Sequence, residues 1–171
     1  MNTRTLYDIP LRGDSMKLLF KKQIKPKFMS IYIKSNDHLY LVANSFNKDN
    51  WIVETDFYNE IPLEASDKEI LTKFKECLDN CNKALPLDLN DKTHLKAICK
   101  ITGYKSYTRA TQGIKLISIE ANDNCEYIIT PTEKKKGQGY LHIGEKKIIC
   151  NEVDLILSIR LVIKIVSISS E

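Results

Sequence analysis

The stretch from residue 51 to residue 81, WIVETDFYNEIPLEASDKEILTKFKECLDNC, contains two hydrophobic periods in succession. Over 51–58, mainly apolar side chains alternate with polar ones, which is the period-2 pattern of a half-buried β-strand. The side chains expected to face the core are Trp51, Val53, Thr55 and Phe57. Over 67–81 the apolar spacing lengthens to that of a helix. A strand followed by a helix predicts a fold that mixes both elements.

The helix predicted over 67–81 has a recognisable start and one apolar side. Ser66 and Glu69 have the spacing of a capping box, in which two side chains satisfy backbone N–H groups at a helix N-terminus. The apolar residues at helical spacing are Ile70, Leu71, Phe74, Cys77, Leu78 and Cys81. We therefore expect an amphipathic helix that buries this side.

Further β-prone runs lie before and after this unit. Residues 28–33 and 39–46 are rich in Tyr, Ile, Val and Leu, and the turn residues 35–37 between them predict a hairpin. Later runs predict a meander with one additional short strand, and they span 114–119, 126–130, 140–143 and 147–150.

A second helix is predicted over Asp91–Ile101. Leu95, Ile98 and Cys99 share one side of it, and Gly103 suits its C-terminal end.

Residues 151–168 fit either a strand or a helix, because alternate positions are apolar while Asp154, Ser158 and Lys164 could share a polar helix side. Asn151 as N-cap, with Asp154 in the first turn, favours the helix. Residues 145–149 lead into this helix much as 59–63 lead into the first, so two loosely repeated strand–helix halves are expected.

Length and composition indicate one domain. The chain has 171 residues, of which 43% are hydrophobic and 28% charged, and this size suits a single core. Residues 1–15 lack sustained periodicity and are predicted to form a flexible arm, leaving 16–171 as the domain. We expect an α+β fold, mostly antiparallel sheet with two or three packed helices.

Export and membrane insertion are not expected. Charged residues interrupt every candidate signal segment near the N-terminus, and they are Asp8, Arg12, Asp14 and Lys17. The longest apolar stretch, 155–168, is interrupted by polar residues and is shorter than the ~20 residues that span a bilayer. The five cysteines, an odd number in largely apolar surroundings, predict packed, reduced thiols, and they are Cys77, Cys81, Cys99, Cys125 and Cys150. A cytoplasmic protein with no membrane partner is expected.

No motif indicates catalysis, a cofactor or a metal. The histidines His38, His94 and His142 have no zinc-site spacing, and Cys77 and Cys81 fall on the apolar helix side. The glycines of 136–139 precede a strand, whereas a phosphate loop opens a helix, so they predict a hairpin turn. We expect a protein that is not an enzyme.

Two surfaces are candidates for binding. The first is an acidic row with one tyrosine, which suits a basic partner, and its members are Glu54, Asp56, Tyr58 and Glu60. An exposed sheet side explains the same alternation. The second could stack and neutralise single-stranded nucleic acid, and its members are Tyr104, Tyr107, Arg109, Lys134, Lys135 and Lys136, with Lys105 nearby. Solvated loop charge is the favoured explanation of this second group, because charge runs are normally solvated.

The segments Thr102–Tyr107 (TGYKSY) and Ile128–Thr132 (IITPT), followed by the closing strand and helix, resemble the immunity proteins of bacterial contact-dependent growth inhibition systems. The resemblance covers residues 27–168 in the order of the elements. It implies a cytosolic protein that binds and neutralises the C-terminal toxin domain, often a nuclease, of a matching CdiA-type effector. The net charge of +4 departs from the acidic character of many antidotes to basic nucleases.

Three hypotheses follow. The first is a toxin-neutralising immunity protein that uses Glu54, Asp56, Tyr58 and Glu60, and the alternative is an RNA-binding accessory module that uses the basic and aromatic group. Direct nucleic-acid binding is disfavoured because the mild positive charge is not concentrated in a stripe. The third is an enzyme whose site, including His142, is assembled from distant residues in a deep polar pocket.

Overall fold

The computed structural model describes residues 25–34, 37–86 and 97–168. Its elements are β1 (Lys27–Lys34), β2 (His38–Phe46), β3 (Ile52–Pro62), α1 (Asp67–Asn80), α2 (Ala97–Thr102), α3 (Tyr107–Ala110), β4 (Ile114–Ala121), β5 (Glu126–Lys135), β6 (Gly139–His142), a 3₁₀ turn (Gly144–Lys146), β7 (Ile148–Asn151) and α4 (Leu155–Ile168). The predicted arm of residues 1–15 lies outside the described residues, as does the first half of the helix expected over 91–101.

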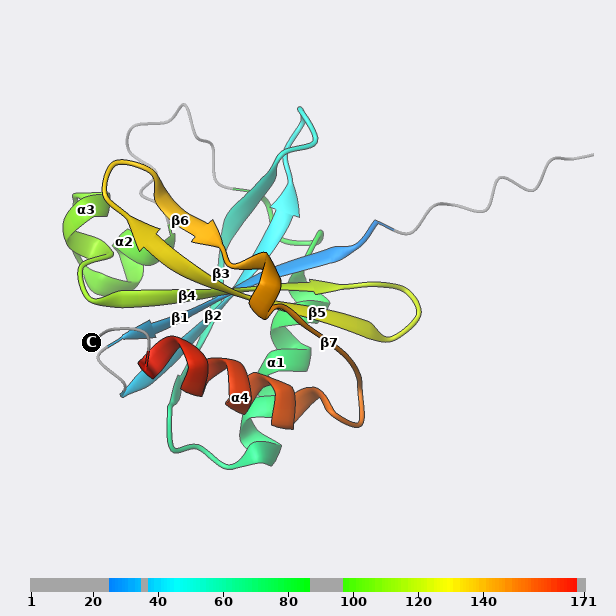
Figure 1. Ribbon diagram of the computed structural model, residues 1–171. Helices are drawn as coiled ribbons and strands as arrows, with labels where there is room; N and C mark the ends of the chain where they lie inside the picture. Colours follow the sequence, from blue (N-terminus) through cyan, green and yellow to red (C-terminus); the bar gives the residue numbers. More distant parts are fainter. Residues whose placement is uncertain (1–24, 35–36, 87–96, 169–171) are drawn as a thin grey trace, which may run out of the picture.

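The described strands form one antiparallel sheet in the order β3-β2-β1-β4-β5-β6, with β7 also paired to β5. β1 is central, because it pairs with β2 on one side and with β4, much later in the chain, on the other. Figure 1 shows α1 and α4 together against one side of the sheet, with α2 and α3 away from them near β6. The predicted α+β fold with a mainly antiparallel sheet is confirmed.

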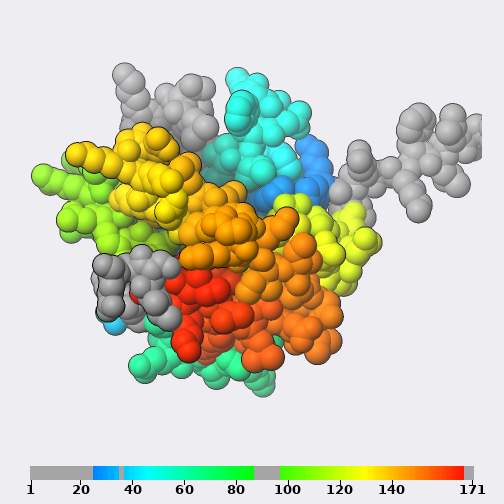
Figure 2. Space-filling view, in the orientation of Figure 1, coloured from blue at the N-terminus to red at the C-terminus, as the bar shows by residue number. Residues whose placement is uncertain are grey.

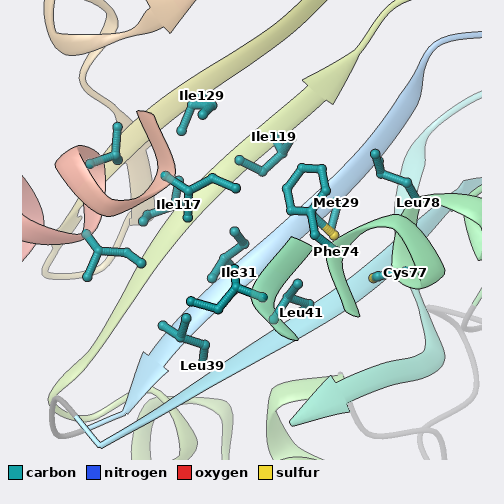
Figure 3. Close-up of a cluster of buried hydrophobic side chains, with 14 of the residues drawn as sticks. Met29, Ile31, Leu39, Leu41, Phe74, Cys77, Leu78, Ile117, Ile119 and Ile129 are labelled. Carbon is teal, nitrogen blue, oxygen red and sulfur yellow. The ribbon is translucent and has the colours of Figure 1, made fainter. Parts of the chain in front are cut away.

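We call the side of the sheet that α1 and α4 cover the core face. Alternation along each strand sends every second side chain to it, as in Met29, Ile31 and Ile33 of β1. Figure 3 shows Phe74 of α1 lying over these strands beside Met29 and Ile119. Phe74 is fully buried, and its ring meets Tyr127 of β5 edge-on at 5.9 Å between centroids. This cluster contains most of the buried apolar residues of the described chain.

α1 begins and ends nearly where the sequence predicts. The Ser66 Oγ accepts a hydrogen bond from the Glu69 backbone N–H at 3.3 Å, which caps the helix. Ile70, Phe74 and Cys77 are buried on its apolar side. Arg160 of α4 fixes the connection before α1, because its guanidinium donates to the backbone oxygens of Leu63 and Ala65 at 2.7 and 2.6 Å.

Residues 155–168 form a helix, as predicted, but its start differs from the prediction. Asn151 still belongs to β7, and its Oδ1 accepts from the backbone N–H groups of Val153 and Asp154, so it closes a turn ahead of the helix. Asp154 precedes the first turn, and its carbonyl accepts from the Ser158 N–H at 3.0 Å. In Figure 2 this helix lies at the surface beside β7.

The opposite side of the sheet, here called the second face, is only partly covered. α2 and α3 pack there on a smaller cluster that includes Tyr32, Val42 and Ile98. The predicted positions of Ile98 and Cys99 in a buried helix side are confirmed, and Gly103 follows the helix at φ 74°, a conformation that favours glycine. α3 was not predicted from the sequence.

Four details correct the sequence analysis. Trp51 precedes β3 and is 70% exposed, because the Asn47–Asn50 turn places it at the hairpin end, away from the core. β3 and β5 extend beyond their predicted ends, to Pro62 and Lys135. Cys125 is exposed, not packed, because it occupies the β4–β5 turn with φ 56°. Lys134 and Lys135 belong to β5, and the glycine turn begins after them.

Candidate binding surface

The four acidic-row residues lie along β3, which is the edge strand of the sheet. Their partners place them on the second face, since Tyr32, Tyr40 and Lys100 of that face contact Glu54, Glu60 and Asp56 in turn. The predicted row therefore shares one side of the molecule. Glu54 is half-buried, and the other three are exposed.

Bonds within the protein hold most of this row in place. The Tyr32 hydroxyl donates to Glu54 Oε1, and the Tyr40 hydroxyl donates to Glu60 Oε1 at 3.1 Å. Lys100 of α2 forms an ion pair with Asp56. Tyr58, in contrast, is 42% exposed in the middle of the row. The row thus presents fixed carboxylates around one accessible aromatic ring.

The tyrosines behind the row remain hydrogen-bond donors at neutral pH. Burial, assisted by the neighbouring Glu54 carboxylate, raises the pKa of Tyr32 far above its ordinary value. Burial and the hydrogen bond to Glu60 raise the pKa of Tyr40 to about 12. Burial likewise raises the pKa of Tyr107 and Tyr140. Each phenol therefore keeps its proton; Tyr32 and Tyr40 donate theirs to carboxylates, and Tyr140 donates to the Ile114 carbonyl oxygen at 2.8 Å.

The basic and aromatic group is dispersed among several environments. Tyr104 is half exposed between α2 and α3, whereas Tyr107 packs into the second-face cluster. The Lys134 Nζ turns back to the Thr111 carbonyl oxygen and hydroxyl at 2.6 and 2.7 Å.

The remaining members of that group are exposed. Lys135 pairs with Glu133 at 2.9 Å. Arg109, on α3, and Lys136, in the turn after β5, are exposed.

A cleft of about 350 Å³ lies on the second face beside the acidic row. Its lining comes from six strands, and consists of Phe28, Ser30, Asn44, Ile52, Leu116, Ser118, Glu120, Ile128, Thr130 and His142. The register aligns Ser30 with Ser118, and Ser118 with Thr130, across β1, β4 and β5. Asn44 is opposite Glu54 in the β2–β3 pairing, which connects the cleft to the acidic row.

His142 lines the cleft. From the sequence, this residue was a candidate for an active site assembled from residues far apart in the chain. Within the described residues, no hydrogen bond or ion pair joins His142 to Glu120 or to a cleft hydroxyl. His38 lies 3.9 Å from Glu60, whereas His94 lies outside the described residues. Cys77 and Cys81 are buried free thiols, and burial raises the pKa of both. In the described ranges, no cluster of three His, Cys, Asp or Glu residues is suited to a metal ion.

The cleft was not predicted, because its polar residues are far apart in the chain and meet only through strand register. Ser30, Ser118 and Thr130 each stand at an ordinary alternate position of a separate strand. The sequence held a partial signal, because small hydroxyl side chains recur at alternate positions of several predicted strands. Their alignment requires knowing that β1 pairs with β4.

Comparisons with known proteins find similarity at the level of the fold. No family model matches the sequence, and no curated protein sequence matches it. A protein of unknown function from Neisseria meningitidis is 12% identical with a TM-score of 0.62, over 83% of this chain and 96% of that one. A chain of the CdiA-CT/CdiI toxin and immunity complex from Yersinia pseudotuberculosis is 15% identical with a TM-score of 0.60, over 82% and 97%. In the described part of the chain, no helix combines the length and apolar character needed to cross a bilayer.

Proposed function

We propose that this protein binds and neutralises the C-terminal toxin domain of a CdiA-type contact-dependent growth inhibition effector, and that it acts by binding, without catalysis, in the cytoplasm. The observation that carries the proposal is the match to a chain of a toxin and immunity complex, which extends over nearly all of that chain. The resemblance of Thr102–Tyr107 and Ile128–Thr132 to immunity proteins of these systems supports the same partner.

The toxin contact is proposed to include Glu54, Asp56, Tyr58 and Glu60. Nucleases hold their substrates by positive charge, because the nucleic-acid backbone is anionic. A row of carboxylates would attract such a surface, and Tyr58 offers rigid contact area that loses little entropy on binding. The bonds from Tyr32, Tyr40 and Lys100 already fix three carboxylates, so their ordering cost is met before the toxin arrives.

The attraction must be local, because the whole chain carries a net charge of +4. Screening at physiological salt limits interactions between exposed charges to about 8 Å. A basic toxin surface would therefore respond to the β3 row at contact distance more than to the total charge.

Co-expression with the toxin domain encoded next to this gene tests the proposal. We expect a complex that survives size-exclusion chromatography, together with survival of cells that express both proteins. If the two proteins elute separately and the cells die, the immunity function is wrong.

Substitutions in the row test the proposed contact. Tyr58→Ala and Asp56→Lys should each weaken toxin binding about tenfold or more, as expected for residues near the centre of an interface. Asp79→Lys is the matched control, because it also breaks an exposed lysine pair, with Lys27 at 3.3 Å, but on α1 behind the core face. If calorimetry finds equal toxin affinity for all three variants, the toxin contact lies elsewhere on the molecule.

A further inference from the structure

The floor of the cleft on the second face contains hydrogen-bonding groups, and some of them have no partner among the described residues. Ser30, Ser118 and Thr130 are consecutive in one row across β1, β4 and β5. Neighbouring strands lie roughly 5 Å apart, so this row spans about 10 Å. Within the described residues, the Ser118 and Thr130 hydroxyls have no hydrogen-bond partner. The row can therefore accept or donate to a molecule placed over it.

Asn44 adds a buried acceptor without a partner. Only 8% of its surface is exposed, and its Nδ2 donates to the Ser30 Oγ at 3.3 Å. Its Oδ1 is buried and has no hydrogen-bond partner in the described part of the chain. An unpaired buried acceptor is unfavourable relative to a satisfied one, so a donor that reaches Asn44 gains an interaction that the free protein lacks.

The lining favours a positively charged occupant. Glu120 contributes a carboxylate, and among the described residues no Lys or Arg lines the cleft. Phe28 gives the cleft an aromatic ring, and the face of an aromatic ring attracts cations. Glu54, opposite Asn44, adds negative charge at the neighbouring position.

We propose that this cleft receives an arginine side chain of the toxin domain, with the guanidinium donating to Glu120, to Asn44 Oδ1 and to the hydroxyl row. This inference rests on the proposed function, because it names the group by which the toxin is recognised. Arginine fits better than lysine, since a planar guanidinium presents five N–H donors in a fixed plane and stacks on aromatic rings. Its methylene stem can pack against Phe28, Ile52 and Ile128, which form apolar walls.

A small-molecule titration tests the cleft independently of any toxin. Nα-acetyl-L-arginine amide is added to the full-length ¹⁵N-labelled protein, and the neutral isostere Nα-acetyl-L-citrulline amide is the comparison. We expect saturable shifts of the Ser118 and Thr130 amides and of the Asn44 side-chain amide, with citrulline binding about tenfold more weakly because its hydrogen bonds lack charge. Equal binding of both compounds, or shifts located elsewhere, would overturn the inference.

Two variants connect the cleft to the charge that it carries. Glu120→Gln should weaken binding of the arginine compound about tenfold, whereas Glu145→Gln, an exposed carboxylate in the 3₁₀ turn outside the cleft lining, should leave it unchanged. If both variants lose the same affinity for the arginine compound, the compound responds only to the net charge of the protein, and the proposed cleft site is wrong.

Blocking the cleft in the toxin complex separates this inference from the proposed function. Ser118→Met fills the floor, and we expect about tenfold or more loss of toxin affinity with an unchanged Tm. If a folded Ser118→Met protein binds the toxin as tightly as the unmodified protein, the cleft inference is wrong and the immunity function stands. If the unmodified protein binds the arginine compound but no toxin domain, the guanidinium site stands and the partner assignment fails.

Discussion

The two faces of the sheet are built from the same strands but differ in how completely their polar groups are used. On the core face, Met29, Ile31 and Ile117 are buried with at most 1% of their surface exposed beneath α1 and α4. On the second face, the same strands present Ser30 and Ser118 to a cleft, and α2 and α3 cover only one part.

This difference assigns stability and recognition to opposite sides. Burial of apolar area provides most of the folding free energy, and the core face contains most of that area. Unpaired hydroxyls contribute little to folding and a buried unpaired amide oxygen opposes it, but both kinds of group are available to a partner. Substitutions on the core face should therefore change stability, whereas those in the cleft should change binding.

The largest expected effect is on the core face. Phe74→Ala should lower the free energy of unfolding by about 3–5 kcal/mol, because it removes a fully buried ring and leaves a cavity between α1 and β5. Urea denaturation followed by circular dichroism measures this change. Lys68→Ala, on the exposed side of the same helix, controls for helix propensity and should have almost no effect. A small loss for Phe74→Ala would mean that α1 is not the main cover of the sheet.

An intermediate effect on stability is expected at Tyr32, a buried residue of β1 on the second face. Tyr32→Phe removes the hydroxyl that donates to Glu54 and should cost about 1–2 kcal/mol at pH 7. The pKa of Tyr32 is raised on folding, so its stabilisation is complete below about pH 10 and declines above it, where the unfolded chain loses its proton first.

The unmodified protein should therefore lose stability more steeply than Tyr32→Phe above pH 10, and urea midpoints at pH 9, 10 and 11 provide the test. Tyr40→Phe is a useful companion, because the pKa of Tyr40 is about 12 and its contribution is lost between pH 10 and 12. Parallel pH profiles for the protein and Tyr32→Phe would contradict the buried phenol–carboxylate pair.

The smallest stability effect is expected in the cleft. Ser118→Ala removes a hydroxyl that has no partner among the described residues, so the free energy of unfolding should change by no more than about 0.5 kcal/mol. Thermal unfolding measures it. A loss above 2 kcal/mol would show that the hydroxyl row is a structural network, and the division between the two faces would no longer hold.

The local pattern was sufficient for elements with clear ends. Ser66 and the apolar spacing through Leu78 predicted α1 within one residue of its end. The end of β3 was missed because Asn59 interrupts the apolar alternation, although its side chain is satisfied on the core face by donating to the Lys73 carbonyl oxygen at 3.1 Å. A polar residue with a distant partner looks the same in a sequence as a residue in a loop.

The candidate site was predictable only in part, for the same reason. Local alternation was enough to place Glu54, Asp56 and Glu60 on one side of a strand, but not to find Tyr32, Tyr40 and Lys100 behind them. The alternation in 155–168 fitted a strand as well as the helix that was predicted, because Leu157 and Leu161 are apolar yet 68% and 51% exposed. Pairings across long sequence separations determine which side chains meet.

The central position of β1 also has a consequence for synthesis on the ribosome. β1 pairs with β2 almost at once, but its other edge waits for β4, where Lys34 faces Ile114 and Lys27 faces Ala121. At bacterial and eukaryotic elongation rates of about 5–20 residues per second, the intervening stretch of about 80 residues takes roughly 4–16 seconds to emerge. During that interval a nascent sheet of β1, β2 and β3 exposes an unpaired apolar edge. Chaperone depletion should therefore lower the soluble yield of newly synthesised protein below the yield obtained when the completed chain is refolded in vitro.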